Sequence, residues 1–416
     1  MAFDLMIRRA RLRDGSLQDI GVRGEKIAAI AGPLEGPADV ELDAGGCLVT
    51  PAYADPHLHL DKAYIAEGMT ARKGGSFQEA VEATLQSRRK YKVPEVVERA
   101  SKVVELAVRY GTTALRGFAD VGTVGGLVPM EAILQVKEQY ADVIDIQVVP
   151  FPQEGIIRDP GAEELLVEAM KMGGDVLGGF PWFELSAVYA QEHIDRIFRI
   201  AKEFDSDIHM LVDDEPLAPH CRNIEQLAVK TIAEERQGRV TVSHACGLAS
   251  FDEFSAGRII QLIKEADISV CCNAHVSLVS KCESAPEPRP RGITRVRDLL
   301  EAGVNVTCAQ DDVSDPYYPF GRADMLEVGS FLAHTAHLHR LEQLQAAYDA
   351  VTVNAARAMR LEGYGLEVGC YADLVVLEEA ATVGQAFSLQ PERRHVIRRG
   401  RVVAESFTQT RLHRRS

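Results

Sequence analysis

Three kinds of segment are missing from this 416-residue sequence, and each absence excludes a class of protein. No apolar run approaches the length needed to span a membrane, and the first residues lack the pattern of a secretory signal peptide. The eight cysteines are scattered without a CxxC spacing, which is typical of reduced thiols rather than a disulfide framework. We therefore expect a cytoplasmic protein without a membrane partner.

Basic residues are also in short supply. The chain has 46 Lys and Arg against 61 Asp and Glu, a formal net charge of −15. Because nucleic acids require a basic protein face, we expect no nucleic-acid partner. The hydrophobic content of 46% and the length are instead typical of a globular protein with a sizeable core.

Strand-like apolar runs alternate with amphipathic helical stretches along the middle of the chain. This alternation indicates βα units and a parallel sheet. The predicted helices span residues 95–109, 162–172, 191–204 and 224–236. The predicted strands lie near residue 48 and at residues 112–115, 144–149, 176–179, 208–212, 240–243, 268–272 and 304–308. Eight strands predict an α/β fold, a (β/α)₈ TIM-like barrel over residues 51–360.

Both ends of the chain have a different pattern. Residues 1–50 and 361–416 contain short strands separated by turns. We predict that these two segments pair into a composite β-sandwich-like domain beside the barrel.

Residues 56–62 (PHLHLDK) carry the first chemical signal. His57 and His59 are two residues apart on an extended strand, so their side chains point to the same side. Two neutral imidazoles at one strand end make half of a metal site. The alternative is a pair of histidines satisfied by ordinary hydrogen bonds.

Further polar side chains follow other predicted strands. His209, His244 and His275 follow three of them, and Asp311 and Asp312 follow the last. Barrel enzymes place their chemistry at the C-terminal ends of the strands, so these residues are expected to meet His57 and His59 on one face. The combination favours a complete metal site.

Five segments resemble the amidohydrolase superfamily, and most of all its cytosine deaminase branch. They are residues 57–61, 152–156, 241–244, 291–296 and 311–319. The resemblance implies one divalent metal ion per chain (zinc or iron, or else manganese) held by His57, His59, His209 and Asp311. It also implies that Asp311 takes a proton from the metal-bound water and that His244 steadies the hydroxide or the developing oxyanion. Gln153 matches the family residue that hydrogen-bonds a ring amide.

Three positions depart from the cytosine deaminase pattern. Val212 stands where these enzymes carry a proton-shuttling glutamate, and Asp213, Asp214 or Glu215 could replace it; we favour Asp213. Lys62 is similar to a lysine of N-isopropylammelide amidohydrolases, so it is a candidate acid or substrate ligand, although a salt bridge to Asp61 is an alternative. Residues 116–120 lack the histidine usual on the second strand.

These features predict a hydrolase in which metal-bound hydroxide attacks a ring carbon of a small polar heterocycle, a pyrimidine or triazine, and expels ammonia. Removal of an N-alkylamine or opening of a cyclic amide or imide is the alternative, and a non-catalytic binder of the same fold is a remote one. Tyr317, Trp182 and Phe183 are candidates to stack on the ring. The apolar residues of 326–338 fit either core or interface, and we expect a homo-oligomer.

Overall fold

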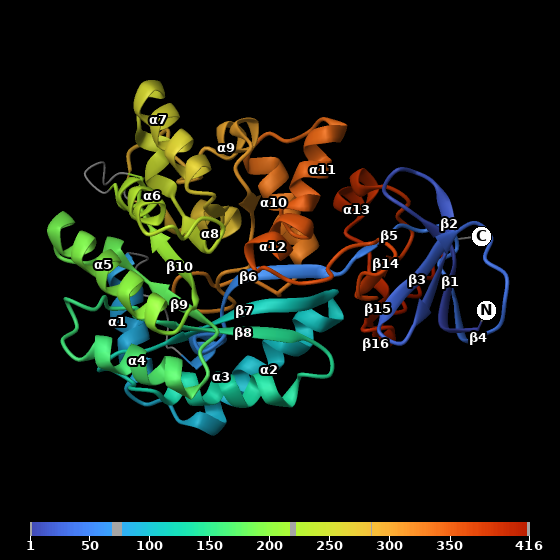
Figure 1. The fold of residues 1–416 in the computed structure, drawn as a ribbon, viewed down its shortest axis with the longest axis horizontal. Coiled ribbons are helices and arrows are strands. Elements are labelled where there is room, and N and C mark those ends of the chain that lie inside the picture. Colours follow the sequence, from blue (N-terminus) through green and yellow to red (C-terminus); the bar gives the residue numbers. More distant parts are fainter. Residues whose placement is uncertain (1, 69–76, 217–221, 284, 414–416) are drawn as a thin grey trace.

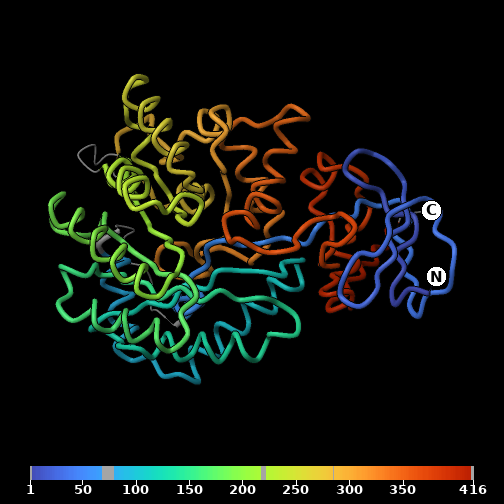
Figure 2. The backbone as a smooth tube through the Cα atoms, viewed as in Figure 1, coloured from blue at the N-terminus to red at the C-terminus, as the bar shows by residue number. Residues whose placement is uncertain are grey.

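The computed structural model describes residues 2–68, 77–216, 222–283 and 285–413. Figure 1 shows a large lobe, in which helices surround a set of strands, and a smaller β lobe that holds both termini. The tube in Figure 2 shows that the first and last described segments of the chain both lie in that smaller lobe. Within the described ranges, none of the helices has the length and apolar character needed to cross a membrane.

Eight parallel strands form the centre of the large lobe. Three pair in the order β6-β7-β8 and five in the order β9-β10-β11-β12-β13. They are β6 (Tyr53–His59), β7 (Thr112–Asp120), β8 (Asp145–Phe151), β9 (Val176–Gly179), β10 (Asp207–Val212), β11 (Val240–His244), β12 (Ser269–Cys271) and β13 (Val306–Thr307).

Backbone contacts connect these two groups of strands. On one side, Asp175 N donates to Val148 O at 2.9 Å, which sets β9 beside β8. On the other, Asp311 N donates to His57 O at 2.8 Å and His59 N donates to Asp311 O at 2.7 Å, which ties the segment after β13 to β6. The predicted (β/α)₈ barrel is confirmed.

Helices cover the barrel because each has one apolar face. α2 (Val93–Arg109) buries residues spaced three and four apart, among them Val96, Ala100, Val103 and Val104. The others are α1 (Phe77–Arg88), α3 (Val128–Gln139), α4 (Ala162–Met172), α5 (Ala187–Glu203), α6 (Asn223–Ala233), α7 (Glu253–Glu265), α8 (Ala274–Ser280), α9 (Val296–Ala302), α10 (Met325–Thr335), α11 (Leu341–Asp349), α12 (Val353–Ala358) and α13 (Val383–Leu389).

The small lobe contains two four-stranded sheets. One has the order β3-β2-β1-β4 and the other the order β16-β15-β14-β5. Their inner faces share one hydrophobic core, in which Ile7 and Ile20 lie with Leu374 and Ile397. The strands are β1 (Phe3–Arg11), β2 (Leu17–Arg23), β3 (Lys26–Ala31), β4 (Ala38–Asp43), β5 (Val49–Pro51), β14 (Leu374–Leu377), β15 (Arg393–Arg398) and β16 (Arg401–Glu405). Both ends of the chain therefore build the small lobe, while the bounds 1–50 and 361–416 stay a prediction.

The first barrel strand lies later than we predicted. The apolar run near Leu48 forms β5, which pairs antiparallel with β14 in the small lobe. The chain changes partners between Ala52, whose nitrogen donates to Asp373 O, and Tyr53, whose nitrogen donates to Gly111 O. A continuous apolar run does not reveal which neighbour each part of it pairs with.

Candidate metal centre and substrate pocket

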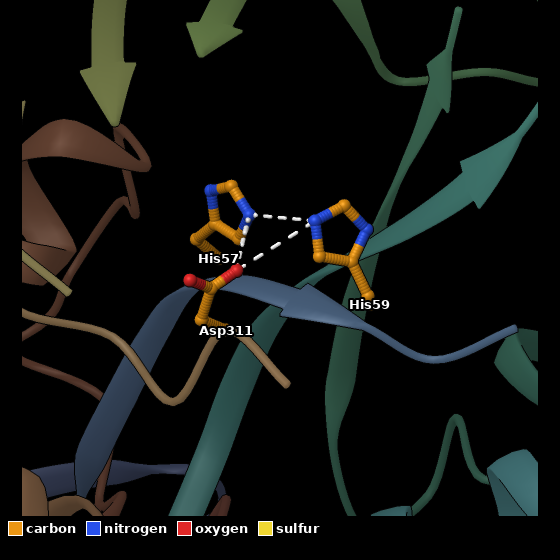
Figure 3. Close-up of side chains that lie close together, drawn as sticks. All are labelled: His57, His59 and Asp311. Atoms are coloured by element: carbon orange, nitrogen blue, oxygen red, sulfur yellow. Dashed lines mark hydrogen bonds and ion pairs between the residues drawn. The ribbon is translucent and has the colours of Figure 1, made fainter. Parts of the chain in front are cut away.

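Three of the four predicted ligands meet at the C-terminal end of β6. His57 Nε2 lies 3.1 Å from His59 Nε2, and Asp311 Oδ1 lies 3.1 Å from His57 Nε2 and 3.6 Å from His59 Nε2 (Figure 3). His57 and His59 come from β6, and Asp311 is held beside them by its two backbone bonds to that strand. We call these three residues the metal cluster.

The protonation of the metal cluster suits a cation. Burial lowers the pKa of His57 and of His59, so both imidazoles are neutral near pH 7 and each offers a lone pair. Burial alone would raise the pKa of Asp311, but its contacts with His244 and His57 outweigh burial and hold that pKa well below its ordinary value. Two lone pairs and one carboxylate thus converge, and Asp311 Oδ2 has no hydrogen-bond partner among the described residues. The site fits a divalent metal ion.

His209, the fourth predicted ligand, lies beside this cluster on β10. Its ring is edge-on to that of His57, with centroids 5.2 Å apart. The Ser243 hydroxyl lies between the two rings, 2.6 Å from His57 Nδ1 and 2.7 Å from His209 Nε2. Sequence reasoning missed Ser243, although its place one residue before His244 at the end of a predicted strand was a usable signal.

A second group of acidic residues adjoins the metal cluster but already contains cations. Lys62 Nζ lies 3.4 Å from Asp120 Oδ1, and Arg88 Nη1 lies 3.5 Å from Asp120 Oδ2. Asp61 lies beside them and accepts from Asp120 N at 3.4 Å. We call Asp61, Lys62, Arg88 and Asp120 the lysine cluster. Its carboxylates are compensated by side chains of the protein itself.

Lys62 stays a cation in this environment. Burial alone would lower the pKa of Lys62, but the carboxylates of Asp120 and Asp61 outweigh it and hold that pKa above its ordinary value. Lys62 Nζ also donates to Gln153 Oε1 at 2.5 Å, so the amide nitrogen of Gln153 is the group that can donate to a substrate.

Asp213, our favoured proton shuttle, does not line the pocket. Its carboxylate accepts hydrogen bonds from Asn223 N at 2.9 Å and Ile224 N at 3.1 Å, in the first turn of α6. Those nitrogens have no partner within the helix and attract a carboxylate. Asp214 lies in the pocket instead, with Oδ1 3.2 Å from His244 Nδ1 and Oδ2 2.6 Å from Lys281 Nζ. Glu215, the remaining alternative, accepts from Cys282 N at 3.3 Å.

The aromatic predictions divide in the same way. Tyr317 lines the pocket, with its ring centroid 5.5 Å from Lys62 Nζ. Trp182 and Phe183 do not, because Phe180 stands on the pocket wall and packs against both. Phe180 directly follows the predicted strand 176–179, so its position could have identified it. The residues that line this pocket are His59, Lys62, Gln153, Phe180, Leu211, Asp214, His244, Val276, Ser280, Lys281, Asp311, Asp312 and Tyr317.

His275, the histidine after the seventh strand, does not join the metal cluster. It lies in the first turn of α8, and its Nε2 is 2.9 Å from Gln310 O. It is a buried histidine with an ordinary hydrogen-bond partner.

Known proteins have similar sequences and structures. Residues 73–404 match the amidohydrolase family. The N-isopropylammelide isopropyl amidohydrolase of Pseudomonas sp. strain ADP is 34% identical over 410 residues, which cover 97% of this chain and 98% of that protein. The pterin deaminase of Rhizobium rhizogenes is 30% identical over 400 residues, which cover 94% and 87%.

Similarity extends to solved structures. The 5-methylcytosine deaminase from Klebsiella pneumoniae, liganded with 5-fluorocytosine, matches with a TM-score of 0.93 and 30% identity, covering 98% of this chain and 99% of that one. Both the family match and the relatives span most of the chain. The chain therefore belongs to the amidohydrolase family and is an enzyme acting on carbon–nitrogen bonds other than peptide bonds.

Proposed function

We propose that this enzyme hydrolyses a carbon–nitrogen bond of a small nitrogen heterocycle, a pyrimidine- or triazine-like ring, and releases ammonia. The observation that carries the proposal is the metal cluster of His57, His59 and Asp311, opening into a pocket lined by hydrogen-bonding groups. We assign one divalent ion, zinc, iron or manganese, to this cluster, with His209 as a further ligand. When bound, such an ion supplies a Lewis acid that lowers the pKa of a water molecule toward neutrality.

Asp311 and His244 are placed to move protons beside that ion. The Asp311 carboxylate accepts the proton of the attacking water through Oδ2. His244 Nε2 lies 3.8 Å from Oδ2, and its Nδ1 faces the carboxylate of Asp214. With the Asp214 carboxylate 3.2 Å from Nδ1, the His244 ring is oriented so that its Nε2 points toward Asp311 and the reacting atoms.

Lys62 and Gln153 are placed to recognise the ring edge. The Lys62 ammonium and the Gln153 amide nitrogen are both donors, so they fit a ring carbonyl or a deprotonated ring nitrogen. Tyr317 and Phe180 supply the apolar walls for a planar ring.

Removal of an N-alkylamine, or ring opening, is the second candidate. Val212 is buried at the third position after His209 and Asp213 points away, so neither offers a carboxylate to the pocket, and Asp214, which does line it, is paired with Lys281. The similarity to a protein named N-isopropylammelide isopropyl amidohydrolase supports the same alternative.

Product analysis separates these candidates. Metal-loaded enzyme is incubated with cytosine, isocytosine, ammelide, N-alkylammelides and cyclic imides, and the products are identified by mass. An amino group replaced by oxygen supports deamination, whereas release of an alkylamine or a ring-opened product supports the second candidate. If no compound is hydrolysed by the metal-loaded enzyme, the proposed substrate class is wrong.

A further inference from the structure

Glu184 is a buried carboxylate that accepts four hydrogen bonds. Its Oε1 accepts from Ile156 N at 2.7 Å, Ile157 N at 3.0 Å and His193 Nδ1 at 2.7 Å, and its Oε2 accepts from Arg158 N at 3.0 Å. The three backbone donors are consecutive and belong to the loop after β8. A carboxylate removed from water is costly unless it is satisfied in this way. This one holds a loop rather than pairing with a lysine or arginine.

The loop that Glu184 holds also carries Gln153, which we assign to substrate recognition. Gly155 lies between Gln153 and the three backbone donors, and it has a φ of +82°. A Cβ on Gly155 would lie 2.6 Å from Glu184 Oε1, so only glycine fits at this close approach. The backbone that follows Gln153 is therefore in direct contact with the Glu184 carboxylate.

His193 extends this contact to the opposite wall of the pocket. On α5, it is fully buried, and its Nε2 accepts from Phe180 N at 3.0 Å while Nδ1 faces Glu184. A neutral imidazole protonated on Nδ1 satisfies both contacts at once. Phe180 lines the pocket, as Gln153 does.

We propose that Glu184 and His193 are positioning residues that fix the Gln153 loop and Phe180 relative to each other, and so determine how tightly the pocket binds its ring substrate. The inference rests on the proposed function, because it assigns Gln153 to the ring edge. Neither Glu184 nor His193 lines the pocket itself. Glu184 accepts from the backbone nitrogens of residues 156–158, and His193 accepts from the backbone nitrogen of Phe180. Both residues therefore act on the pocket through the backbone.

Glu184→Gln is the sharpest variant. The side-chain amide keeps the size of the carboxylate but replaces one accepting oxygen with an NH₂ group, which faces a backbone N–H and cannot accept from it. We expect KM to rise about 10-fold, while kcat changes by less than about 3-fold and the metal content is unchanged. Glu192→Gln, a half-exposed residue next to His193 on α5, is the matched control and should change neither constant.

The test is a double-mutant cycle with Gln153→Ala, measured on the panel compound that the wild type hydrolyses fastest. If Glu184 acts through Gln153, the KM of the double variant matches that of Gln153→Ala alone. Hydrogen exchange of the amides of residues 156–158 is followed in parallel, and we expect it to speed up in Glu184→Gln and not in Glu192→Gln.

Each outcome decides the inference. Additive KM effects, or a kcat loss with unchanged KM, would overturn it, because the pair would then be ordinary core packing. If Glu184→Gln fails to fold, His193→Ala carries the same cycle, since it removes the Phe180 contact and one of the four bonds to Glu184. A wild type that hydrolyses no panel compound overturns the proposed function, and the exchange rates still decide whether Glu184 holds the loop.

Discussion

The metal cluster and the lysine cluster lie side by side and share His59 as a neighbour, yet the negative charge of their buried carboxylates is compensated differently. In the lysine cluster, Lys62 and Arg88 place their own cations against Asp120. In the metal cluster, Asp311 faces the lone pairs of His57 and His59, which are neutral. The protein's own side chains compensate the negative charge of the lysine cluster. The negative charge of Asp311 is compensated by a cation only when a metal ion binds.

This difference supports our proposal of one ion rather than two. His59, Asp61 and Asp120 come close enough together to hold a metal, as do Asp214, His244 and Cys246. Each of these groups, however, already has a lysine against its carboxylate, Lys62 in one and Lys281 in the other. A second cation would have to displace a buried ammonium. Whether a lysine already compensates the carboxylate is therefore a better criterion for a metal site than the closeness of histidine, cysteine and acidic side chains alone.

The largest effect is expected from removing a ligand of the metal cluster. His57→Ala should abolish turnover of any panel substrate, because it removes one of the assigned imidazole ligands and with it firm binding of the ion. Turnover is measured at saturating metal and substrate. His339→Ala, an exposed histidine, is the control. Wild-type turnover in His57→Ala would show that the metal cluster is not the catalytic centre.

Removing the protein's own cation should destabilise the neighbouring cluster. Lys62→Met keeps the side-chain volume but leaves the carboxylate of Asp120 with less compensation, so the free energy of unfolding should fall by about 3–5 kcal/mol. Urea denaturation measures this. Lys102→Met, in an exposed pair with Glu98, should change it by less than about 1 kcal/mol. Equal changes in the two variants would mean that the lysine cluster does not depend on Lys62.

The alternation of elements and the two histidines of β6 were predictable because both follow simple periodicities. Helix 162–172 and the strand at 176–179 match the predicted bounds, and His57 and His59 do project to one side. These features depend only on neighbours along the chain.

The residues that sequence reasoning misplaced depend on the path of the chain after a strand. Asp213 has a φ of +46°, so the chain turns sharply there and consecutive carboxylates diverge, one to α6 and the next to the pocket. Trp182 and Phe183 were ring-stacking candidates, whereas Phe180, which packs against both, is the residue on the pocket wall. Neither outcome follows from spacing, because both are set by loop conformation.

Asp214 and Asp213 offer a direct comparison of two adjacent carboxylates. Asp214→Asn should lower kcat about 10- to 100-fold, because His244 loses the charged partner of its Nδ1. Asp213→Asn should leave kcat within about 2-fold and remove part of the first-turn contact of α6, which costs about 1 kcal/mol of stability. Steady-state kinetics and thermal unfolding of both variants make the comparison. The reverse pattern of kcat losses would restore Asp213 as the proton shuttle.

The smallest expected effect is a pH dependence that depends on Asp213. Burial raises the pKa of Asp213 from 3.8 to about 7. Between these two values the folded chain holds a proton that the unfolded chain has released, so this group favours folding below pH 4 and loses that contribution as the pH rises through 7. The free energy of unfolding should therefore fall less between pH 5 and pH 7.5 in Asp213→Asn than in the wild type. Identical pH profiles in urea denaturation would contradict the raised pKa of Asp213.

Metal content tests the central claim most directly. The wild type, Asp311→Asn and Asp120→Asn are loaded with zinc, freed of loosely bound ions, and analysed by plasma mass spectrometry. We predict one ion per chain in the wild type and in Asp120→Asn, and a loss of most of the bound zinc in Asp311→Asn. Two ions per chain in the wild type, or zinc lost from Asp120→Asn and retained in Asp311→Asn, would contradict the assignment of the metal to His57, His59 and Asp311.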